Sequence, residues 1–307
     1  MSRIKDLEKE IKHHNDLYWI QNAPEISDTD YDLLIEELRD LDPKNPLLSE
    51  LTEQISGTPV SHRVPMLSMG KAYTIDEIIK WVKGIKCNHF TISPKMDGVA
   101  CELVYDSNGK FSHAATRGNG TVGEDISQAV KLIDNIPQQL AADPDGEIEV
   151  RGEIVMHLDE FKKYEDEYAN PRNLASGTIK QKNPSKRDKK DLKFYAYNVL
   201  GTAHETESDK FAAIREFGLT HVKTRTVKKD EIKETLEELT SGRGKLPYEI
   251  DGIIITAGDV SLQEKMGCTS HHPRYAIALK FQGESGSTVL EDIEWSVSRT
   301  GQITPVA

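Results

Sequence analysis

The sequence has few cysteines, and no pattern joins them. Only three occur among 307 residues, Cys87, Cys101 and Cys268, and none belongs to a CxxC pair. This spacing speaks against a structural zinc site and against a disulfide framework. We therefore expect the three cysteines to be small buried apolar residues.

Long hydrophobic runs are absent as well. No stretch approaches the roughly 20 apolar residues that a membrane-spanning helix needs, and the N-terminal MSRIKDLEKE lacks the apolar core of a signal peptide. There is no internal repeat and no low-complexity tract. With 37% hydrophobic and 29% charged residues, the chain is predicted to be a soluble cytoplasmic protein with room for one large domain or two smaller ones.

Positive charge is scarce. Lys and Arg number 39 against 51 Asp and Glu, which gives a formal net charge of −12. Taken alone, this balance argues against nucleic-acid binding, because phosphate binding usually leaves a basic imprint. Residues 180–193, KQKNPSKRDKKDLK, are locally basic, and by itself such a run is typical of a solvated loop.

Two amphipathic helices are predicted at the start of the chain. Residues 3–20 place apolar side chains at helical spacing. In the second helix, Ser27 and Asp30 form an S-x-x-D capping box and Pro43 ends the helix. The first ~45 residues should therefore form a helical hairpin. Residues 43–65 contain four prolines and little periodicity, which indicates a linker.

Short strands and helices alternate in the remainder of the chain. Thr74 and Glu77 cap a helix, and strands begin at Phe90. Further strands are predicted at 147–156, 192–200, 248–256 and 275–281, and helices at 158–168, 171–181, 208–217 and 230–240. No regular βαβ period is present, so the pattern favours an α+β fold with largely antiparallel sheets over a doubly wound fold.

The stretch FTISPKMDGVACELVY, residues 90–105, places Lys95 and the pair Asp97-Gly98 between two apolar runs. An Asp-Gly pair in this setting is typical of a hairpin turn, so an exposed turn lysine is the simpler interpretation of KMDG. A reactive lysine must lose its proton, and with an ordinary pKa of about 10.4 it needs cationic neighbours or desolvation.

Charged residues recur at comparable places in other apolar strands: Arg117, Arg151, Glu153 and Lys280. Each alone fits a half-exposed strand, but together they indicate a cleft. Arg117 opens the loop TRGNGTVGED, which has three glycines. Such a loop can bring backbone N–H groups and a guanidinium to a phosphate, or it can be only a turn.

Eight ordered segments carry a resemblance to a known family. They are KMDG, ATRGNGTVGEDIS, IPQQL, RGEIVM, ANPRNLASGTIKQ, YEIDGIII, PRYAIALKF and RTGQITPVA. This set resembles the adenylation part of bacterial NAD-dependent DNA ligases. NAPEISDTDYDLLIEEL and VPMLSMGKAY are similar to that family's nicotinamide-binding module and the link after it. The resemblance covers nearly the whole chain in order.

The resemblance implies a fold and a division into domains. Residues 1–66 would form a small helical module that binds nicotinamide mononucleotide, together with its linker. Residues 67–300 would form a nucleotidyltransferase domain of antiparallel sheets flanked by helices, an ATP-grasp-like ligase fold. Residues 301–307 would begin an OB-fold. Family members continue through this OB-fold into further DNA-binding domains, so the chain would be either a fragment of a longer ligase or a minimal form, and its end inside a strand-like motif favours the fragment.

The resemblance also implies a reaction. Lys95 would attack the α-phosphate of NAD, release nicotinamide mononucleotide and become lysyl-AMP. The AMP would then pass to the 5′-phosphate of a DNA nick, and the 3′-hydroxyl would seal the strand. Mg²⁺ is implied, without an assignment of its ligands. The partners would be NAD and nicked double-stranded DNA, the protein would be a monomer, and residues 180–193 would face the DNA.

Site residues follow from the same resemblance. Asp97 and Glu153 would serve the ribose and the metal-assisted steps, Arg117 the nucleotide and DNA phosphates, and Tyr197 the adenine face. Lys280 would stabilise charge on the α-phosphate, the expected use of a fixed cation in phosphoryl-type transfer.

Asp28, Tyr31 and Asp32 in the N-terminal module are spaced i, i+3, i+4, so two carboxylates and a phenol share one helix face. This face could hold the cationic nicotinamide ring. Alternatively, the aspartates favour a helix N-terminus and Tyr31 is a packing residue; both can hold. Tyr18 is the family's further ring partner. Ser68, Met69 and Ile254 complete the implied NAD-binding set.

Four positions depart from the family's pattern. Ser93 stands where a glutamate usually contacts adenine, and Thr256 stands where a lysine usually follows the DGvvI strand; Trp19 and Lys180 replace a histidine and an arginine. Thr256 removes positive charge where the nucleophile and the transition state need it. An alternative hypothesis is therefore a degenerate ligase-like protein that binds NAD or nicked DNA without chemistry. A third hypothesis, an ATP- or GTP-using nucleotidyltransferase, leaves the nicotinamide module without a use.

Overall fold

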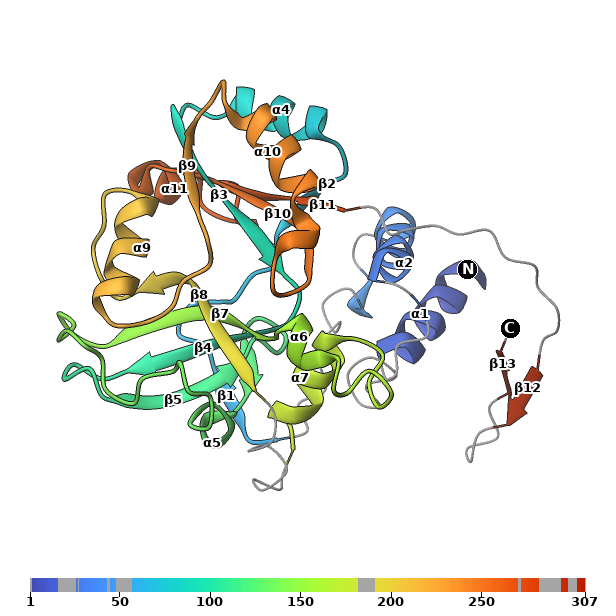
Figure 1. Ribbon diagram of the computed structural model, residues 1–307. Coiled ribbons are helices and arrows are strands. Elements are labelled where there is room, and N and C mark those ends of the chain that lie inside the picture. The colour runs from blue at the N-terminus through green and yellow to red at the C-terminus, as the bar shows by residue number, and fades with distance from the viewer. Residues whose placement is uncertain are drawn as a thin grey trace.

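Two β-sheets form the body of the protein (Figure 1). The structure is a computed structural model that describes residues 2–15, 26, 28–42, 45–47, 57–181, 191–269, 272–281, 294–297 and 303–306. The five-stranded sheet has the order β2-β11-β10-β3-β9, with β2 Gly70–Ala72, β11 Ala276–Lys280, β10 Ile250–Ala257, β3 His89–Met96 and β9 Arg225–Lys228. The four-stranded sheet has the order β5-β4-β7-β8, with β5 Phe111–Thr116, β4 Val99–Tyr105, β7 Ile148–Met156 and β8 Leu192–Leu200.

Within these two sheets, β2 and β11 form a parallel pair, and every other described pair of strands is antiparallel. The prediction of an α+β fold with largely antiparallel sheets is thus confirmed. The described strands β3, β7, β8, β10 and β11 also lie within two residues of the boundaries expected from the sequence.

Helices α4 (Ile75–Gly84) and α10 (Ile232–Ser241) lie together over the five-stranded sheet (Figure 1). The predicted capping box is present, because the Thr74 hydroxyl accepts a hydrogen bond from the Glu77 N–H and Glu77 accepts one from the Thr74 N–H. Buried side chains of both helices pack with those of β3 and β10 in one core: Ile78, Val82, Phe90, Ile92, Ile232, Leu236, Ile253 and Ile255. Burial of each large apolar side chain contributes roughly 1.5–3 kcal/mol, so this core fixes the strands that carry the lysines.

A second core lies on the four-stranded sheet. Its other walls are α5 (Ser127–Val130), α7 (Pro171–Ile179) and α9 (Glu207–Glu216), with α6 (Leu158–Phe161) nearby. Tyr105, Phe194 and Ile154 are among its largest fully buried side chains. One face of β7 is therefore committed to packing, and the alternate residues of β7 point to the other face.

The N-terminal helices form a core of their own. Helices α1 (Ser2–Asn15) and α2 (Asp28–Leu41) bury Leu7, Ile11 and Leu38 between them. The guanidinium of Arg3 also donates to both carboxylate oxygens of Glu37, over 2.7 and 2.6 Å. The described residues thus confirm the predicted pair of packed helices. Ser27 lies outside the described residues, as does the end of the helix expected over 3–20.

Some expectations were wrong. The helix predicted over 158–168 ends at Phe161, because the chain then turns to pack Tyr164 and Tyr168 on the second core and to reach Asn170, which caps α7. Cys87 and Cys101 are buried as expected. Cys268 is exposed; it follows Gly267, the C-cap of α11 (Val260–Met266), and forms an isolated β-bridge with Pro273.

The segment expected to be a linker contains a strand. Residues Pro59–Ser61 form β1, which pairs with β6 (Val122–Glu124). The four prolines of residues 43–65 concealed this strand, although β1 lies at an edge where proline is tolerated. Near the C-terminus, β12 (Glu294–Val297) pairs with β13 (Ile303–Val306). No helix in the described ranges is both long and apolar enough to cross a membrane.

Candidate functional site

Lys95 and Lys280 meet at one carboxylate. Both are register partners of Gly252, Lys95 on β3 and Lys280 on β11. Each Nζ donates to the same atom, Oδ2 of Asp251, over 2.8 Å. Burial acts to raise the pKa of Asp251, but the two lysines outweigh it and lower that pKa. Three strands of one sheet thus bring together two ammonium groups and an ionised carboxylate.

A register irregularity explains how Asp251 reaches this place. In regular strand geometry neighbouring residues point to opposite faces, so Asp251 would point away from the face shared by Gly252 and its partners. The pairing of β10 with β3 shifts between Ile250 and Gly252, and such an irregularity re-aims a side chain. The other oxygen of Asp251, Oδ1, is buried and has no hydrogen-bond partner among the described residues.

The pair Asp97-Gly98 connects the two sheets. Strand β3 pairs with β10 and β9, whereas β4 pairs with β5 and β7, so the interpretation of KMDG as a hairpin was wrong. A Cβ at Gly98 would lie 2.3 Å from the carbonyl oxygen of Ile154 and 2.8 Å from Cγ1 of Val155. Only glycine therefore lets the connection pass this close to β7 without a shift of the backbone.

Asp97 is held by a residue from helix α7. Nη1 of Arg172 donates to Oδ1 of Asp97 over 2.8 Å, and both side chains are about one quarter exposed, at 25% and 24%. Because Arg172 lies in the first turn of α7, after the Pro171 that starts this helix, the pair also anchors the helix beside the connection between the sheets.

Glu153 lies among these charges. It is the register partner of Ala100 on β4. Burial raises the pKa of Glu153 to about 7, against the opposing effect of Lys95, Arg172 and Arg117, while Asp97 acts in the same direction as burial. Tyr197 adjoins Glu153, and burial followed by the charge of Glu153 raises the pKa of the Tyr197 phenol.

Arg117 begins the glycine-rich loop between β5 and β6. Its N–H donates to the Ala100 carbonyl and its own carbonyl accepts from the Gly120 N–H, over 2.9 and 3.0 Å. Gly118 has φ of +52°, and a Cβ there would lie only 1.9 Å from the Val122 carbonyl oxygen. The loop is thus a tight turn that returns to its starting strand, with the Arg117 side chain in electrostatic reach of Glu153.

We call the set at the meeting of the two sheets the junction cluster: Lys95, Asp97, Arg117, Glu153, Arg172, Asp251 and Lys280. The structure brings the predicted residues Lys95, Asp97, Arg117, Glu153, Tyr197 and Lys280 together in or beside it. Ile254 lies further along β10, opposite Ser93 on one side and Ala278 on the other. Ser93 and Thr256, two of the positions that depart from the family's pattern, thus lie on the same face of the sheet as Lys95 and Gly252.

Two members of the junction cluster were missed from the sequence, Asp251 and Arg172. Both fall in segments that carry the family resemblance, and a charged residue in each segment was the available signal. Arg151, by contrast, was expected beside Lys95 and is engaged elsewhere. Its guanidinium binds Glu149 at 2.5 Å and the Pro65 carbonyl at 3.0 Å. Arg151 lies two residues before Glu153 on β7, and this separation places it roughly 7 Å further from the junction cluster.

Several of the expected nicotinamide-binding residues fall outside the described part of the chain. Tyr18 is not among the described residues, and the side chains of Asp28 and Asp32 are not described, although both belong to helix α2. Tyr31 packs against the core of α1 and α2. Ser68 and Met69 directly precede β2, which pairs with the strand that ends at Lys280.

The donors of the cluster fit a diphosphate better than a preformed metal cage. Within the described part of the chain, no three His, Cys, Asp or Glu side chains gather as metal ligands. Mg²⁺, however, is usually held by one or two carboxylates together with substrate phosphates, and Asp97 and Glu153 supply two carboxyl groups beside four cations.

Comparison with known proteins gives two family matches. Residues 56–284 match the NAD-dependent DNA ligase adenylation domain, and residues 1–52 match the DNA ligase-like, N-terminal NAD+-binding domain. A protein of Endomicrobium trichonymphae named DNA ligase is 38% identical over 335 residues, which cover 100% of this chain and 50% of the relative. A DNA ligase of Halothermothrix orenii is 37% identical, with 99% of this chain and 49% of the relative covered. The chain therefore spans about half the length of the curated relatives it matches.

Two solved structures that match the chain share little sequence with it. An archaeal ATP-dependent RNA ligase has 13% identity and a TM-score of 0.44, covering 75% of this chain and 51% of its own. An ATP-dependent DNA ligase of bacteriophage T7 in complex with ATP has 13% identity and a TM-score of 0.39, covering 76% of this chain and 79% of its own.

Proposed function

Because the chain belongs to the family of NAD-dependent DNA ligase adenylation domains, we propose that it transfers AMP from NAD to its own Lys95. The observation that carries this proposal is the meeting of Lys95 and Lys280 on one oxygen of Asp251, over 2.8 Å each. In the longer protein, the AMP would pass to the 5′-phosphate of a DNA nick, which would then be sealed.

The proposed step uses the cluster's charges. Lys95 Nζ, having lost a proton to solvent, forms a bond to the α-phosphorus of NAD, the bond from this phosphorus to the nicotinamide mononucleotide oxygen breaks, and this mononucleotide leaves. Lys280, fixed by Asp251, stabilises the charge that develops on the phosphate oxygens. Arg117 and Arg172 add two guanidiniums, which bind phosphate oxygens in a planar fork.

Features of the structure fit NAD at this place. Gly98 lets the connection pass close to β7, which keeps Lys95 and Asp97 in electrostatic reach of Glu153. The buried and unbonded Oδ1 of Asp251 offers an acceptor. Asp97 and Glu153 would hold Mg²⁺ together with the phosphates of NAD, and when bound this ion would neutralise part of their negative charge.

The proposal extends to organisation. Residues 1–66 would be the nicotinamide-binding module and its linker, 67–300 the adenylation domain and 301–307 the beginning of an OB-fold. Tyr18, Asp28, Tyr31 and Asp32 would hold the nicotinamide ring, while Ser68, Met69, Ile254 and Tyr197 would line the nucleotide. We further propose a cytoplasmic monomer. Its basic run, residues 182–190 of which lie outside the described part, would face nicked DNA.

Intact-mass spectrometry tests the reaction. The protein is incubated with Mg²⁺ and either NAD or ATP, next to the variants Lys95→Ala and Lys86→Ala; Lys86 is an exposed lysine shortly before β3. We expect one AMP adduct from NAD in the wild-type protein and in Lys86→Ala, and none in Lys95→Ala or from ATP. An adduct that persists in Lys95→Ala would overturn the assignment of the nucleophile.

One observation favours a second candidate function, binding without chemistry. Thr256 lies on the same face as Lys95 at a place where the family's pattern has a lysine, and Lys95 itself is engaged by Asp251. Calorimetry distinguishes the two functions: heat of NAD binding together with no adduct after long incubation would support a binding module and reject self-adenylation.

A further inference from the structure

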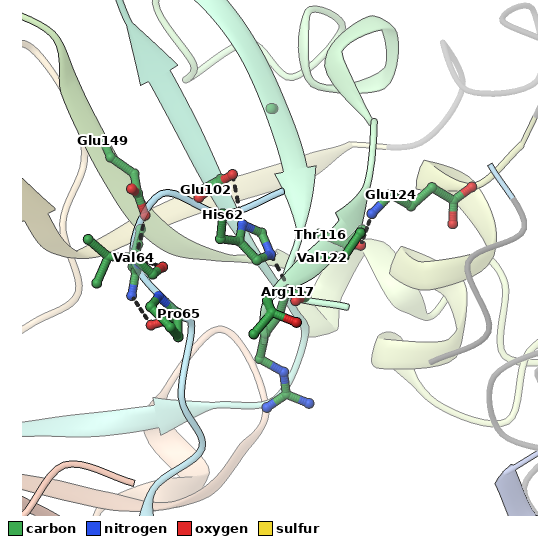
Figure 2. A network of polar contacts seen from close by, with 12 residues as sticks. His62, Val64, Pro65, Glu102, Thr116, Arg117, Val122, Glu124 and Glu149 are labelled. Atoms are coloured by element: carbon green, nitrogen blue, oxygen red, sulfur yellow. Dashed lines mark hydrogen bonds and ion pairs between the residues drawn. The ribbon is translucent and has the colours of Figure 1, made fainter. Parts of the chain in front are cut away.

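A second group of polar residues lies behind the glycine-rich loop, and no step of the proposed reaction uses it. We call it the His62 network: His62, Glu102 and Glu149, which Figure 2 labels, together with Arg151. Its four residues are all buried, from 2% exposed for Glu102 to 9% for His62. Burial of so many charges costs free energy of folding unless each charge is paired and hydrogen-bonded. This cost indicates a functional role for the four residues.

His62 stands between two acceptors. Its Nδ1 lies 2.8 Å from Oε1 of Glu102, and its Nε2 lies 2.9 Å from the carbonyl oxygen of Arg117. A carboxylate and a carbonyl oxygen only accept hydrogen bonds, and a neutral imidazole has only one N–H. The Glu102 contact is an ion pair outside hydrogen-bond geometry, and Nδ1 has no hydrogen-bond partner among the described residues. This ion pair and the hydrogen bond to the Arg117 carbonyl exist together only in the imidazolium form of His62.

The surrounding charges support this protonation state. Burial acts to lower the pKa of His62, but Glu102 and the Arg117 carbonyl outweigh burial and raise it above its usual range, with Arg151 opposing them. Burial acts to raise the pKa of Glu102, and His62 outweighs it and lowers that pKa. Glu149 behind them has a raised pKa, first because of its burial.

The chain around His62 is fastened to the glycine-rich loop. The His62 N–H donates to the Thr121 carbonyl over 2.9 Å, and the Met66 N–H donates to the Gly120 carbonyl over 2.7 Å. Arg151 binds the Pro65 carbonyl between them, over 3.0 Å. The loop thus rests on residues 62–66, and these residues rest on β7.

Arg117 is oriented by this contact. Figure 2 shows its carbonyl turned toward the His62 ring, while its guanidinium extends in the opposite direction. That guanidinium is in electrostatic reach of Glu153 and Tyr197. A displaced carbonyl would rotate the peptide unit from which the Arg117 side chain projects, and a misplacement of about 1 Å can cost on the order of 100-fold in rate.

We propose that His62 is a positioning residue for adenylation: its imidazolium, held by Glu102, fixes the Arg117 carbonyl and thereby aims the Arg117 guanidinium at the junction cluster. This inference rests on the proposed function. His62 itself touches neither NAD nor Lys95 in this role; it acts through Arg117.

The proposal implies a dependence on pH. The charged and titratable groups that face His62 are Glu102 on β4, Glu149 and Arg151 on β7, and Arg117 in the loop. Because the folded pKa of His62 is raised, its stabilising effect is complete below its unfolded pKa of about 6.5 and is lost as pH rises through the folded pKa. Above that pH the ring keeps one donor for two acceptors, and the loop loosens.

Single-turnover adduct formation from NAD tests this between pH 6 and pH 9. The wild-type protein is compared with His62→Gln, with Glu102→Gln, and with His89→Gln as an exposed control on β3. We expect the rate at saturating NAD to fall on the order of 10- to 100-fold in His62→Gln, with little change in the NAD concentration that gives half-maximal rate. Glu102→Gln should move the alkaline fall in rate to lower pH, and His89→Gln should match the wild type.

A second measurement does not depend on NAD. Nuclear magnetic resonance reports the protonation of both His62 ring nitrogens, and hydrogen exchange reports the protection of the loop amides. We expect the wild-type ring to be doubly protonated at pH 7, and the Gly120 amide to exchange faster in His62→Gln. A neutral ring, or equal exchange in both proteins, would overturn the positioning role. A wild-type protein that forms no adduct would instead reject the proposed function.

Discussion

Asp251 is the residue on which the two lysines depend. Its Oδ2 accepts from both ammonium groups over 2.8 Å, so Asp251→Asn would leave two cations side by side with a weaker acceptor. We expect the free energy of unfolding to fall by about 1–3 kcal/mol at neutral pH, and the rate of adduct formation to fall on the order of 100-fold. Urea unfolding and single-turnover kinetics measure the two effects.

The pH dependence of that loss follows from the lowered pKa of Asp251. A carboxyl group of this kind stabilises the fold above its unfolded pKa of about 3.9, and the effect is lost as pH falls through the folded pKa. The difference in the free energy of unfolding between wild type and Asp251→Asn should therefore shrink toward low pH. Asp145→Asn, at an exposed position, is the matched control; a gap of the same size in this variant would contradict the argument.

Glu153 shows the opposite sign. Its pKa is raised to about 7 by burial, so the fold favours its protonated form, and stability is lost as pH rises from about 4.5 through 7. Glu153→Gln should thus be more stable than wild type at pH 8, and its advantage should be about 2 kcal/mol larger than at pH 5. We also expect slower adenylation in this variant. Urea unfolding at the two pH values measures this difference in the free energy of unfolding. A stability advantage of Glu153→Gln that does not change with pH would contradict the raised pKa of Glu153.

The connection between β3 and β4 leaves no room for a side chain at Gly98. In Gly98→Ala the new Cβ would lie 2.3 Å from a β7 carbonyl oxygen, so the connection must move, and with it Lys95. Overpacking of this kind costs about 1–3 kcal/mol. We expect the thermal midpoint to fall and adduct formation to slow.

Gly84→Ala is the control for that variant, because nothing lies within 4 Å of a Cβ at Gly84, near the end of α4. Alanine should raise stability slightly there, by about 0.5–1 kcal/mol. If the two alanine variants unfold at the same temperature and react at the same rate, the close approach of Gly98 to β7 is not important.

Elements could be predicted from the sequence where the signal is local. The Thr74 capping box and the apolar strands are such signals, and they placed α4, β7, β8 and β10 closely. Pairing is not local: nothing near KMDG indicates that β3 and β4 belong to different sheets. The same limit hid Arg172, whose partner Asp97 is 75 residues away, and Asp251, whose direction depends on a register shift.

In the whole molecule, the proposed function depends on bringing charged groups from separate elements to one phosphate group. The lysines come from the five-stranded sheet, Glu153 from the four-stranded sheet and Arg172 from helix α7. Only the Asp97-Gly98 connection joins β3 directly to β4. A change in the angle between the sheets would therefore alter the distances among these charges.

The N-terminal helices allow a test of whether nicotinamide recognition lies in a different part of the chain from the junction cluster. Among the described residues, the core of α1 and α2 shares no member with the two other cores, so a variant that begins at Gly57 should keep the thermal midpoint of the sheets. If residues 1–56 hold the nicotinamide ring, this variant should lose about 3 kcal/mol of NAD recognition, which is on the order of 100-fold in the second-order rate constant of adduct formation from NAD. The intact chain with Asp28→Asn, Tyr31→Ala and Asp32→Asn should show a loss of the same order, and Leu33→Ala, at an exposed position of α2, should show none. An unchanged second-order rate constant in the shortened protein would place nicotinamide recognition on the sheets instead of on α2.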